Sequence, residues 1–134
     1  MIIFNLLKKQ AIKNPNKIAI IFGDEKYTYG ELLKMIVKTI IAFKKKGLNK
    51  NDVVLILEDN TIFHVLSLFA ASFLNVTLVP LGTTYSNNHV KKFIKIIKVN
   101  SLIGDSQYLR AFNKIKVKIF TDNLKLLEFN RINL

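Results

Sequence analysis

The stretch from Asp52 to Pro80, DVVLILEDNTIFHVLSLFAASFLNVTLVP, decides the fold. Residues 52–57 form a continuous apolar run rather than an alternating one, which is typical of a strand that helices cover on both faces. Residues 61–74 are apolar nearly all round and predict a buried helix, whereas residues 76–80 are rich in β-branched side chains and favour a second strand. Together these segments form a β-α-β unit, so we expect a parallel sheet.

Further helices and strands alternate on both sides of this unit. Towards the amino terminus, the pattern predicts a helix over residues 3–13, a hairpin of strands 17–22 and 26–29, and a helix over residues 31–46 that Gly47 ends. Towards the carboxyl terminus, it predicts a helix from Ser86, a strand over residues 101–104, a helix from Asp105 to about residue 113 and a strand over residues 116–121. The pattern assigns no element to residues 123–134.

The order of these elements defines the expected fold class. It predicts an α/β fold with a doubly wound, largely parallel sheet, flanking helices and an N-terminal β-hairpin near one edge. Half of the 134 residues are hydrophobic, which is enough for one core. We therefore expect a single domain over residues 1–134, with residues 123–134 as its tail.

Residues with capping side chains stand at the predicted helix starts. Thr28 and Glu31 have the spacing of a capping box, and Asn60, Ser86 and Asp105 can each cap the helix that follows. The helix over residues 31–46 has an apolar side, which is expected to consist of Leu32, Leu33, Ile36, Ile40 and Phe43. The helix after Ser86 is amphipathic, and the residues expected to face inward are Val90, Phe93, Ile94 and Ile97.

Composition narrows the class of protein. The chain has no cysteine, which excludes disulfides, a thiolate nucleophile and a cysteine-ligated metal, and its two histidines make a zinc site unexpected. The first residues have no secretory cleavage pattern, so we expect a cytoplasmic protein. Residues 62–81 contain no Asp, Glu, Lys or Arg, but polar residues and Pro80 interrupt them. They therefore predict helix, turn and strand rather than a membrane span.

The formal net charge is +12, which raises nucleic acid or an anionic membrane surface as a partner. The lysines are spread along the whole chain, among many Ile and Asn residues, without the interleaved exposed aromatics of single-strand binders. We therefore expect no nucleic-acid partner.

Ligands of open α/β sheets bind beyond the carboxyl ends of the strands. The candidate positions are therefore Asp59, Asn60, residues 81–85, Asp105 and Ser106. Hydroxyl groups follow the strand over residues 76–80 at Thr83, Thr84, Tyr85 and Ser86, and the helix that starts at Ser86 can attract a phosphate through its free amides. Helix capping and loop solvation are the preferred interpretation of these residues.

Motifs of several catalytic and nucleotide-binding sites are absent from the sequence. The chain contains no Gly-x-x-x-x-Gly-Lys-Ser/Thr, no Gly-x-Gly-x-x-Gly and no Gly-x-Ser-x-Gly. Ser67 and Ser72 lie inside the apolar helix, which argues against a serine hydrolase. His64 and His89 have no clear carboxylate partner in the sequence, so we interpret both as structural.

An ordered series of segments resembles the AMP-binding adenylate-forming superfamily. Residues 14–32, NPNKIAIIFGDEKYTYGEL, resemble its opening, and TYGEL is the sharpest element. Residues 47–54, GLNKNDVV, resemble Gly-Val-x-Lys-Gly-Asp-x-Val with Asn51 in place of a glycine. Residues 68–81, LFAASFLNVTLVPL, are similar to the family's helix and Gly-Ala-x-x-Val-Pro-Leu strand, with Asn75 in place of a glycine. Residues 101–105, SLIGD, also match in place.

This resemblance implies a reaction in which ATP and a carboxylate form an acyl adenylate, which is then transferred to coenzyme A or to a carrier-protein phosphopantetheine. It also implies ATP and Mg²⁺ as cofactors of the full-length family. The family's phosphate loop, its Tyr-Gly-x-Thr-Glu segment, its ribose-binding Asp and its catalytic Lys lie beyond the region matched here. The resemblance therefore assigns no catalytic, cofactor-binding or metal-ligating residue in this chain.

We therefore expect an N-terminal fragment of an AMP-forming acyl-CoA synthetase or amino-acid-activating ligase that is inactive by itself. Two alternatives remain open. One is a non-catalytic interaction module that associates with the remainder of such an enzyme, with another chain or with itself. The other is a basic binder of nucleic acid or of an anionic membrane surface. The sequence does not separate acyl from aminoacyl substrates.

Overall fold

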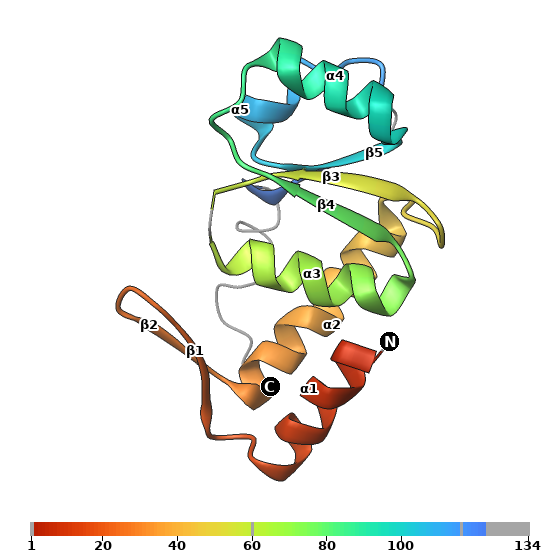
Figure 1. The fold of residues 1–134 in the computed structure, drawn as a ribbon. Helices are drawn as coiled ribbons and strands as arrows, with labels where there is room; N and C mark the ends of the chain where they lie inside the picture. The colour runs from red at the N-terminus through yellow and green to blue at the C-terminus, as the bar shows by residue number, and fades with distance from the viewer. Residues whose placement is uncertain (1, 60, 116, 123–134) are drawn as a thin grey trace.

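A four-stranded sheet forms the centre of the computed structural model, which describes residues 2–59, 61–115 and 117–122 (Figure 1). All neighbouring strands are parallel, as predicted. Pro80 lies in an edge strand, where its missing N–H removes no interior ladder bond. The order of the strands across the sheet is β4 (Thr77–Leu81), β3 (Val53–Leu57), β5 (Ser101–Gly104) and β6 (Val117–Phe120).

Helices cover both faces of this sheet (Figure 1). The helices α1 (Ile2–Lys13), α2 (Tyr29–Lys45) and α3 (Ile62–Leu74) lie on one side, and α4 (Asn87–Ile97) and α5 (Ser106–Leu109) lie on the other. The chain passes from β3 to β4 in one direction and then crosses back to β5 on the other side of β3. Right-handed crossovers in opposite directions place their helices on opposite faces, so the doubly wound class is confirmed.

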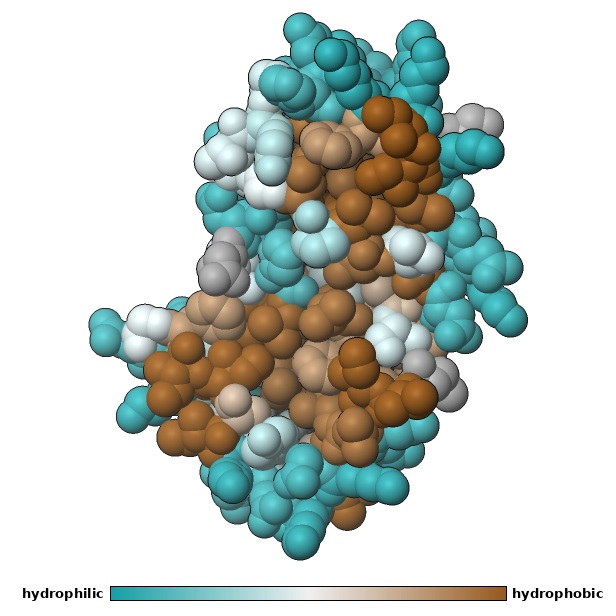
Figure 2. Space-filling view, in the orientation of Figure 1, coloured by the Kyte–Doolittle hydropathy of each residue, from teal (hydrophilic) through white to brown (hydrophobic). Residues whose placement is uncertain are grey.

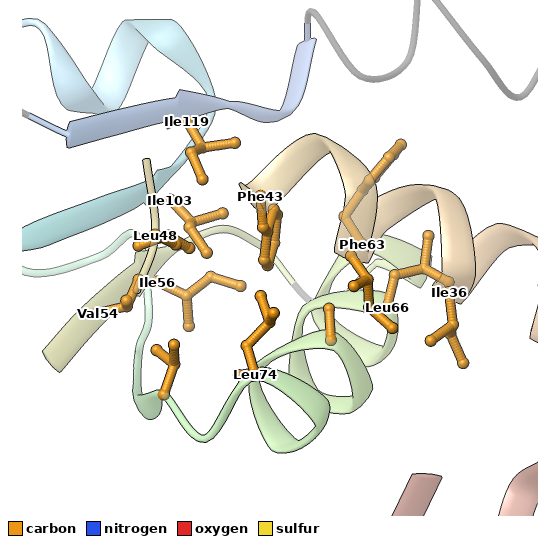
Figure 3. Packing of buried hydrophobic residues seen from close by; sticks show 14 of the residues in the cluster. Ile36, Phe43, Leu48, Val54, Ile56, Phe63, Leu66, Leu74, Ile103 and Ile119 are labelled. Atoms are coloured by element: carbon orange, nitrogen blue, oxygen red, sulfur yellow. The ribbon is translucent and has the colours of Figure 1, made fainter. Parts of the chain in front are cut away.

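Strand β3 is buried on both faces, which explains its continuous apolar run. Val54 and Ile56 belong to the core cluster that α1, α2 and α3 enclose, whereas Leu55 and Leu57 belong to the cluster beneath α4 and α5. Figure 3 shows the first cluster, in which Ile56 and Ile103 of the sheet extend towards Phe43 of α2. No described helix combines the length and the apolar character that a membrane span requires.

The predicted capping box is present at the start of α2. The Thr28 hydroxyl accepts a hydrogen bond from the Glu31 amide at 3.2 Å, and the Glu31 carboxylate accepts one from the Thr28 amide at 2.8 Å. The buried side of α2 agrees with the prediction except at Leu33, which is half-buried. Thr39 joins that side, where its hydroxyl donates to the Met35 carbonyl at 2.9 Å.

The predicted hairpin is present, but its predicted place at one edge of the central sheet is wrong. Strands β1 (Ile18–Phe22) and β2 (Glu25–Thr28) form a separate antiparallel sheet that contacts α2 (Figure 1). Ala19, Ile20 and Tyr27 pack against the core cluster on that side of the molecule. The hairpin therefore packs against the helices on that side and does not add strands to the central sheet.

The helices α3, α4 and α5 depart from the prediction in three respects. Helix α3 is buried along one side only, and Leu68 on its other side is 48% exposed. In α4, Val90 is buried, but Phe93 is half-buried and Ile97 is exposed, so the buried side of this helix is narrower than predicted. Helix α5 ends at Leu109 instead of residue 113, because the chain then turns and buries Phe112.

Two asparagines adopt the left-handed backbone conformation, with φ values of 72° at Asn51 and 55° at Asn75. Asn75 ends α3, where a residue in this conformation allows its N–H to bond to the last carbonyls of the helix. These are the two positions at which the sequence has asparagine where the family pattern has glycine. Asparagine tolerates this conformation better than most other residues with a side chain.

Candidate functional site at the carboxyl ends of the strands

The carboxyl ends of the four parallel strands meet at one edge of the sheet. Helix α3 leaves β3 towards one face and α5 leaves β5 towards the other, so the switch point of the winding lies between these two neighbouring strands. Their backbones approach closely there, since a Cβ atom added to Gly104 would lie 2.2 Å from the Leu57 carbonyl oxygen. A glycine is therefore required at the end of β5.

Three hydroxyl–carboxylate pairs connect the loops that follow the strands. The Thr83 hydroxyl donates to Asp59 at 2.5 Å and joins the loops after β4 and β3. The Thr121 hydroxyl donates to Glu58 at 2.5 Å and joins the segments after β6 and β3. The third pair is Ser106 and Asp122, in which the carboxylate accepts from the amide at 3.1 Å and from the hydroxyl at 2.7 Å. These pairs bind the strand ends to one another.

The second pair is buried, since Glu58 is 5% exposed and Thr121 is inaccessible to solvent. Glu58 and Asp122 also make further interactions. A buried carboxylate costs free energy unless hydrogen bonds satisfy it. The hydrogen bond from the Thr121 hydroxyl therefore offsets part of the cost of burying the Glu58 carboxylate.

The polar residues around the start of α4 also make contacts within that part of the chain. Ser86 caps α4, since its hydroxyl accepts from the His89 amide at 3.3 Å, and it lies 2.9 Å from Nδ1 of the His89 ring. The Tyr85 ring packs edge-on against Phe93, with 5.8 Å between the ring centroids. The capping predicted for Ser86 is therefore confirmed.

Asp105 caps the short helix α5, because its carboxylate accepts from the Gln107 amide at 3.1 Å. The cap predicted at Asp105 is thus confirmed. Helix α3 begins after Thr61, whose side chain makes no capping hydrogen bond. The predicted cap at Asn60 lies outside the described residues and stays a prediction.

The two histidines lie on opposite faces of the sheet, because His64 is in α3 and His89 is in α4. The structure therefore does not bring them together. The buried Nδ1 atom of His64 makes no hydrogen bond, and Ser67 is buried within α3. Among the residues that the structure describes, no three His, Asp or Glu side chains are grouped so that they could hold a metal ion.

Sequence reasoning did not single out Glu58, Thr121 and Asp122. Each of them lies one or two positions after a strand of the parallel sheet, which is the signal that could have identified them. The candidate Ser106 was named, but its partner was not. The pairing depends on the strand order, because Asp122 follows β6 and Ser106 follows its neighbour β5.

An open parallel sheet that is wound on both faces, with polar loops at its carboxyl edge, defines the chain as a doubly wound α/β protein. The family of AMP-binding enzymes matches residues 7–131. The chain belongs to this family. The match confirms the family that the ordered segments of the sequence resemble.

Curated and solved relatives show how much of such an enzyme the chain represents. It is 28% identical to tyrocidine synthase 3 of Brevibacillus parabrevis over 74% of this chain and 2% of that protein. It is 34% identical to 2-succinylbenzoate–CoA ligase of Bacillus licheniformis over 61% of this chain and 17% of that protein.

The structure superimposes on O-succinylbenzoate coenzyme A synthetase of Bacillus subtilis, solved in complex with AMP, with a TM-score of 0.81 and 25% identity. The match covers 88% of this chain and 31% of that one. The chain therefore spans about a third or less of the length of these relatives.

Proposed function

We propose that the chain forms the amino-terminal α/β framework of an AMP-forming ligase and has no adenylation activity by itself. The observation that carries the proposal is the pairing of the strand-end side chains with one another. Thr83, Ser106 and Thr121 each donate to a carboxylate of a neighbouring loop. This arrangement stabilises a scaffold and leaves ATP and its metal ion to be held by other parts of the enzyme.

In the complete enzyme, ATP with Mg²⁺ would activate a carboxylate as an acyl adenylate, and a thiol of coenzyme A or phosphopantetheine would accept the acyl group. Support comes from the family and from relatives of the chain, which include an acetyl-coenzyme A synthetase and a synthetase solved with ATP and a magnesium ion. Activation is needed because a carboxylate oxygen is a poor leaving group, whereas AMP is a good one. The acyl or aminoacyl substrate would be selected outside this chain.

The direct test is ATP–pyrophosphate exchange with the purified chain. Fatty acids, aromatic acids and amino acids are supplied with Mg²⁺ and radiolabelled pyrophosphate, and the Bacillus subtilis synthetase with its own substrate serves as the positive control. We expect no exchange above the protein-free background. Exchange that requires one of these carboxylates would overturn the proposed inactivity.

A chimera tests the proposed framework role. The matching segment of the Bacillus subtilis synthetase is replaced by this chain, and the same chimera with Gly104→Val serves as a control with a disrupted sheet. We expect the first chimera to retain adenylation of the synthetase's own substrate and the control to lose it. An inactive but folded first chimera would contradict the framework role.

A second candidate function is assembly through an apolar surface. Figure 2 shows a brown surface that extends over the hairpin, α3 and the start of α1. Large apolar side chains are exposed on these elements, among them Ile2 and Leu6 on α1, Ile21 on β1 and Leu68 on α3. Exposed apolar patches of this kind mark sites of protein association. The proposed partner is the remainder of an adenylate-forming enzyme.

Sedimentation velocity tests this second function. The chain is mixed with a fragment of the Bacillus subtilis synthetase that lacks the matching segment. The variant Ile21→Glu/Leu68→Glu is compared with Ile96→Glu in α4, which lies on the other side of the sheet from α3. We expect the double variant to abolish the complex and Ile96→Glu to preserve it. Equal complex formation by all three proteins would exclude the surface, and self-association without the fragment would make a second copy the partner.

A further inference from the structure

A groove of about 500 Å³ lies between α4 and the segment that follows α5. Figure 1 shows these two parts next to each other at the top of the molecule, on the face of the sheet opposite α1, α2 and α3. The residues that line the groove are not those that pair at the strand ends, and the proposed adenylation framework gives them no role. The groove is therefore separate from the strand-end pairs.

The base of the groove is apolar. Ile94 of α4 and Ile115 of the opposite wall are half-buried, and Phe112, which also lines the groove, is 5% exposed. These three side chains come from two separate parts of the chain, so the fold itself creates the groove. Its size lies within the range of small-molecule sites, which enclose roughly 300–1,000 Å³ and are lined mainly by apolar side chains.

The rim of the groove is cationic on both sides. Lys91 and Lys95 are one helical turn apart on α4, so they project from the same side of that helix. Lys114 lies on the other wall, and none of the described residues that line the groove is acidic. Lysine side chains extend apolar surface along their stems and carry the charge at the tip, so all three continue the apolar walls and end in positive charge.

We propose that this groove binds a single-chain anionic amphiphile, with a hydrocarbon tail on Ile94, Phe112 and Ile115 and an acidic head group among the lysines. Charge complementarity and the apolar base select this class together: an uncharged alkyl chain leaves the lysines unused, and a purely polar anion leaves the base exposed to water. The inference concerns a face of the chain that the proposed framework role does not use, so either can fail without the other.

Isothermal titration with decanoate, below its micellar concentration, tests the proposal on the full chain. We expect saturable binding of one decanoate per chain and weaker binding at high salt, because the lysines are exposed and screened. Decanol, with the same tail and no charge, is expected to bind about tenfold or more weakly.

Substitutions locate the site. The variant Lys91→Gln/Lys95→Gln is expected to bind decanoate about tenfold more weakly, which is roughly the effect of losing two exposed charge contacts. Lys92→Gln is the matched control, because Lys92 lies on the same helix and does not line the groove. Ile94→Ser tests the apolar base, and circular dichroism checks that each variant is folded.

Three results would overturn the proposal. The first is the absence of decanoate binding to the wild-type chain. The second is an equal loss of decanoate affinity in Lys92→Gln and in the groove variants. That result would mean that the affinity depends on the net charge of the chain and not on the groove. The third is amide chemical-shift changes centred on the apolar surface of α1, α3 and the hairpin rather than on α4 and residues 111–115.

Discussion

The Asn51 amide donates a 3.0 Å hydrogen bond to the Asn75 carbonyl, and both residues have left-handed backbone conformations. Asn51 lies just before β3, and Asn75 lies between α3 and β4. The bond therefore ties together the entrances to two paired parallel strands, next to the bond from the Thr77 amide to the Asp52 carbonyl at 2.9 Å. The left-handed conformation of both asparagines accompanies this hydrogen bond.

Substitution of Asn51 or Asn75 by glycine is expected to leave the free energy of unfolding nearly unchanged. Substitution by alanine is expected to lower it by about 1 kcal/mol at each position, because a Cβ atom without a compensating polar side chain disfavours the left-handed conformation. Urea denaturation measures both effects. Asn88 in α4 is the control, since a helical position reverses the order and favours alanine over glycine.

Loss of the capping box is expected to destabilise α2. Thr28→Ala removes the hydroxyl that accepts from the Glu31 amide and is expected to lower the free energy of unfolding by about 1 kcal/mol. Thr28→Ser keeps the acceptor and is expected to stay close to the wild type. Thermal unfolding followed by circular dichroism compares the two variants. Equal destabilisation by serine and alanine would show that the Thr28 methyl group matters instead of the cap.

Gly104→Ala is expected to be strongly destabilising, by about 1–3 kcal/mol or more, because the new Cβ atom would overlap the Leu57 carbonyl oxygen and force the backbones of β3 and β5 apart. Gly82→Ala is the matched control. Its Cβ atom would meet only the Thr84 hydroxyl, at 3.9 Å, so it is expected to have a small effect. Guanidinium denaturation of both variants measures the difference, and equal stability would contradict the close approach of the strands.

Tyr27 is expected to make stability depend on alkaline pH. Burial is the main cause and a hydrogen bond to Glu25 the next, and together they raise the pKa of Tyr27 from 10.0 to about 12. Between these values the unfolded chain releases the phenol proton before the folded chain does, so this group's contribution to stability falls as pH rises from about 10 to about 12.

Urea midpoints measured at about pH 9 and about pH 11 test this dependence. Tyr27→Phe is expected to lose part of the decline that the wild type shows. Tyr85→Phe, which alters an exposed tyrosine, controls for the general loss of lysine charge. Equal declines in both variants would rule out the proposed contribution of Tyr27.

The sequence was sufficient to predict those features that depend only on residues close together in the chain. The capping box of Thr28 and Glu31 requires only their spacing and a helix after them, so it was predictable. The apolar run of β3 likewise indicated a strand covered on both faces. The hairpin was also predicted from its local pattern, but its contact with α2 was not, because that contact joins apolar surfaces of separate elements.

The sequence by itself determined the α/β class, the caps at Thr28, Ser86 and Asp105, and the family, because periodicity, capping residues and ordered motifs are all local properties of the chain. Only the tertiary structure decided the strand order, which places Thr121 against Glu58 although 63 positions separate them. It also decided that Lys91 and Lys114 line one groove. Such contacts depend on which elements pack together, and that is fixed by the burial of the whole core rather than by any single segment.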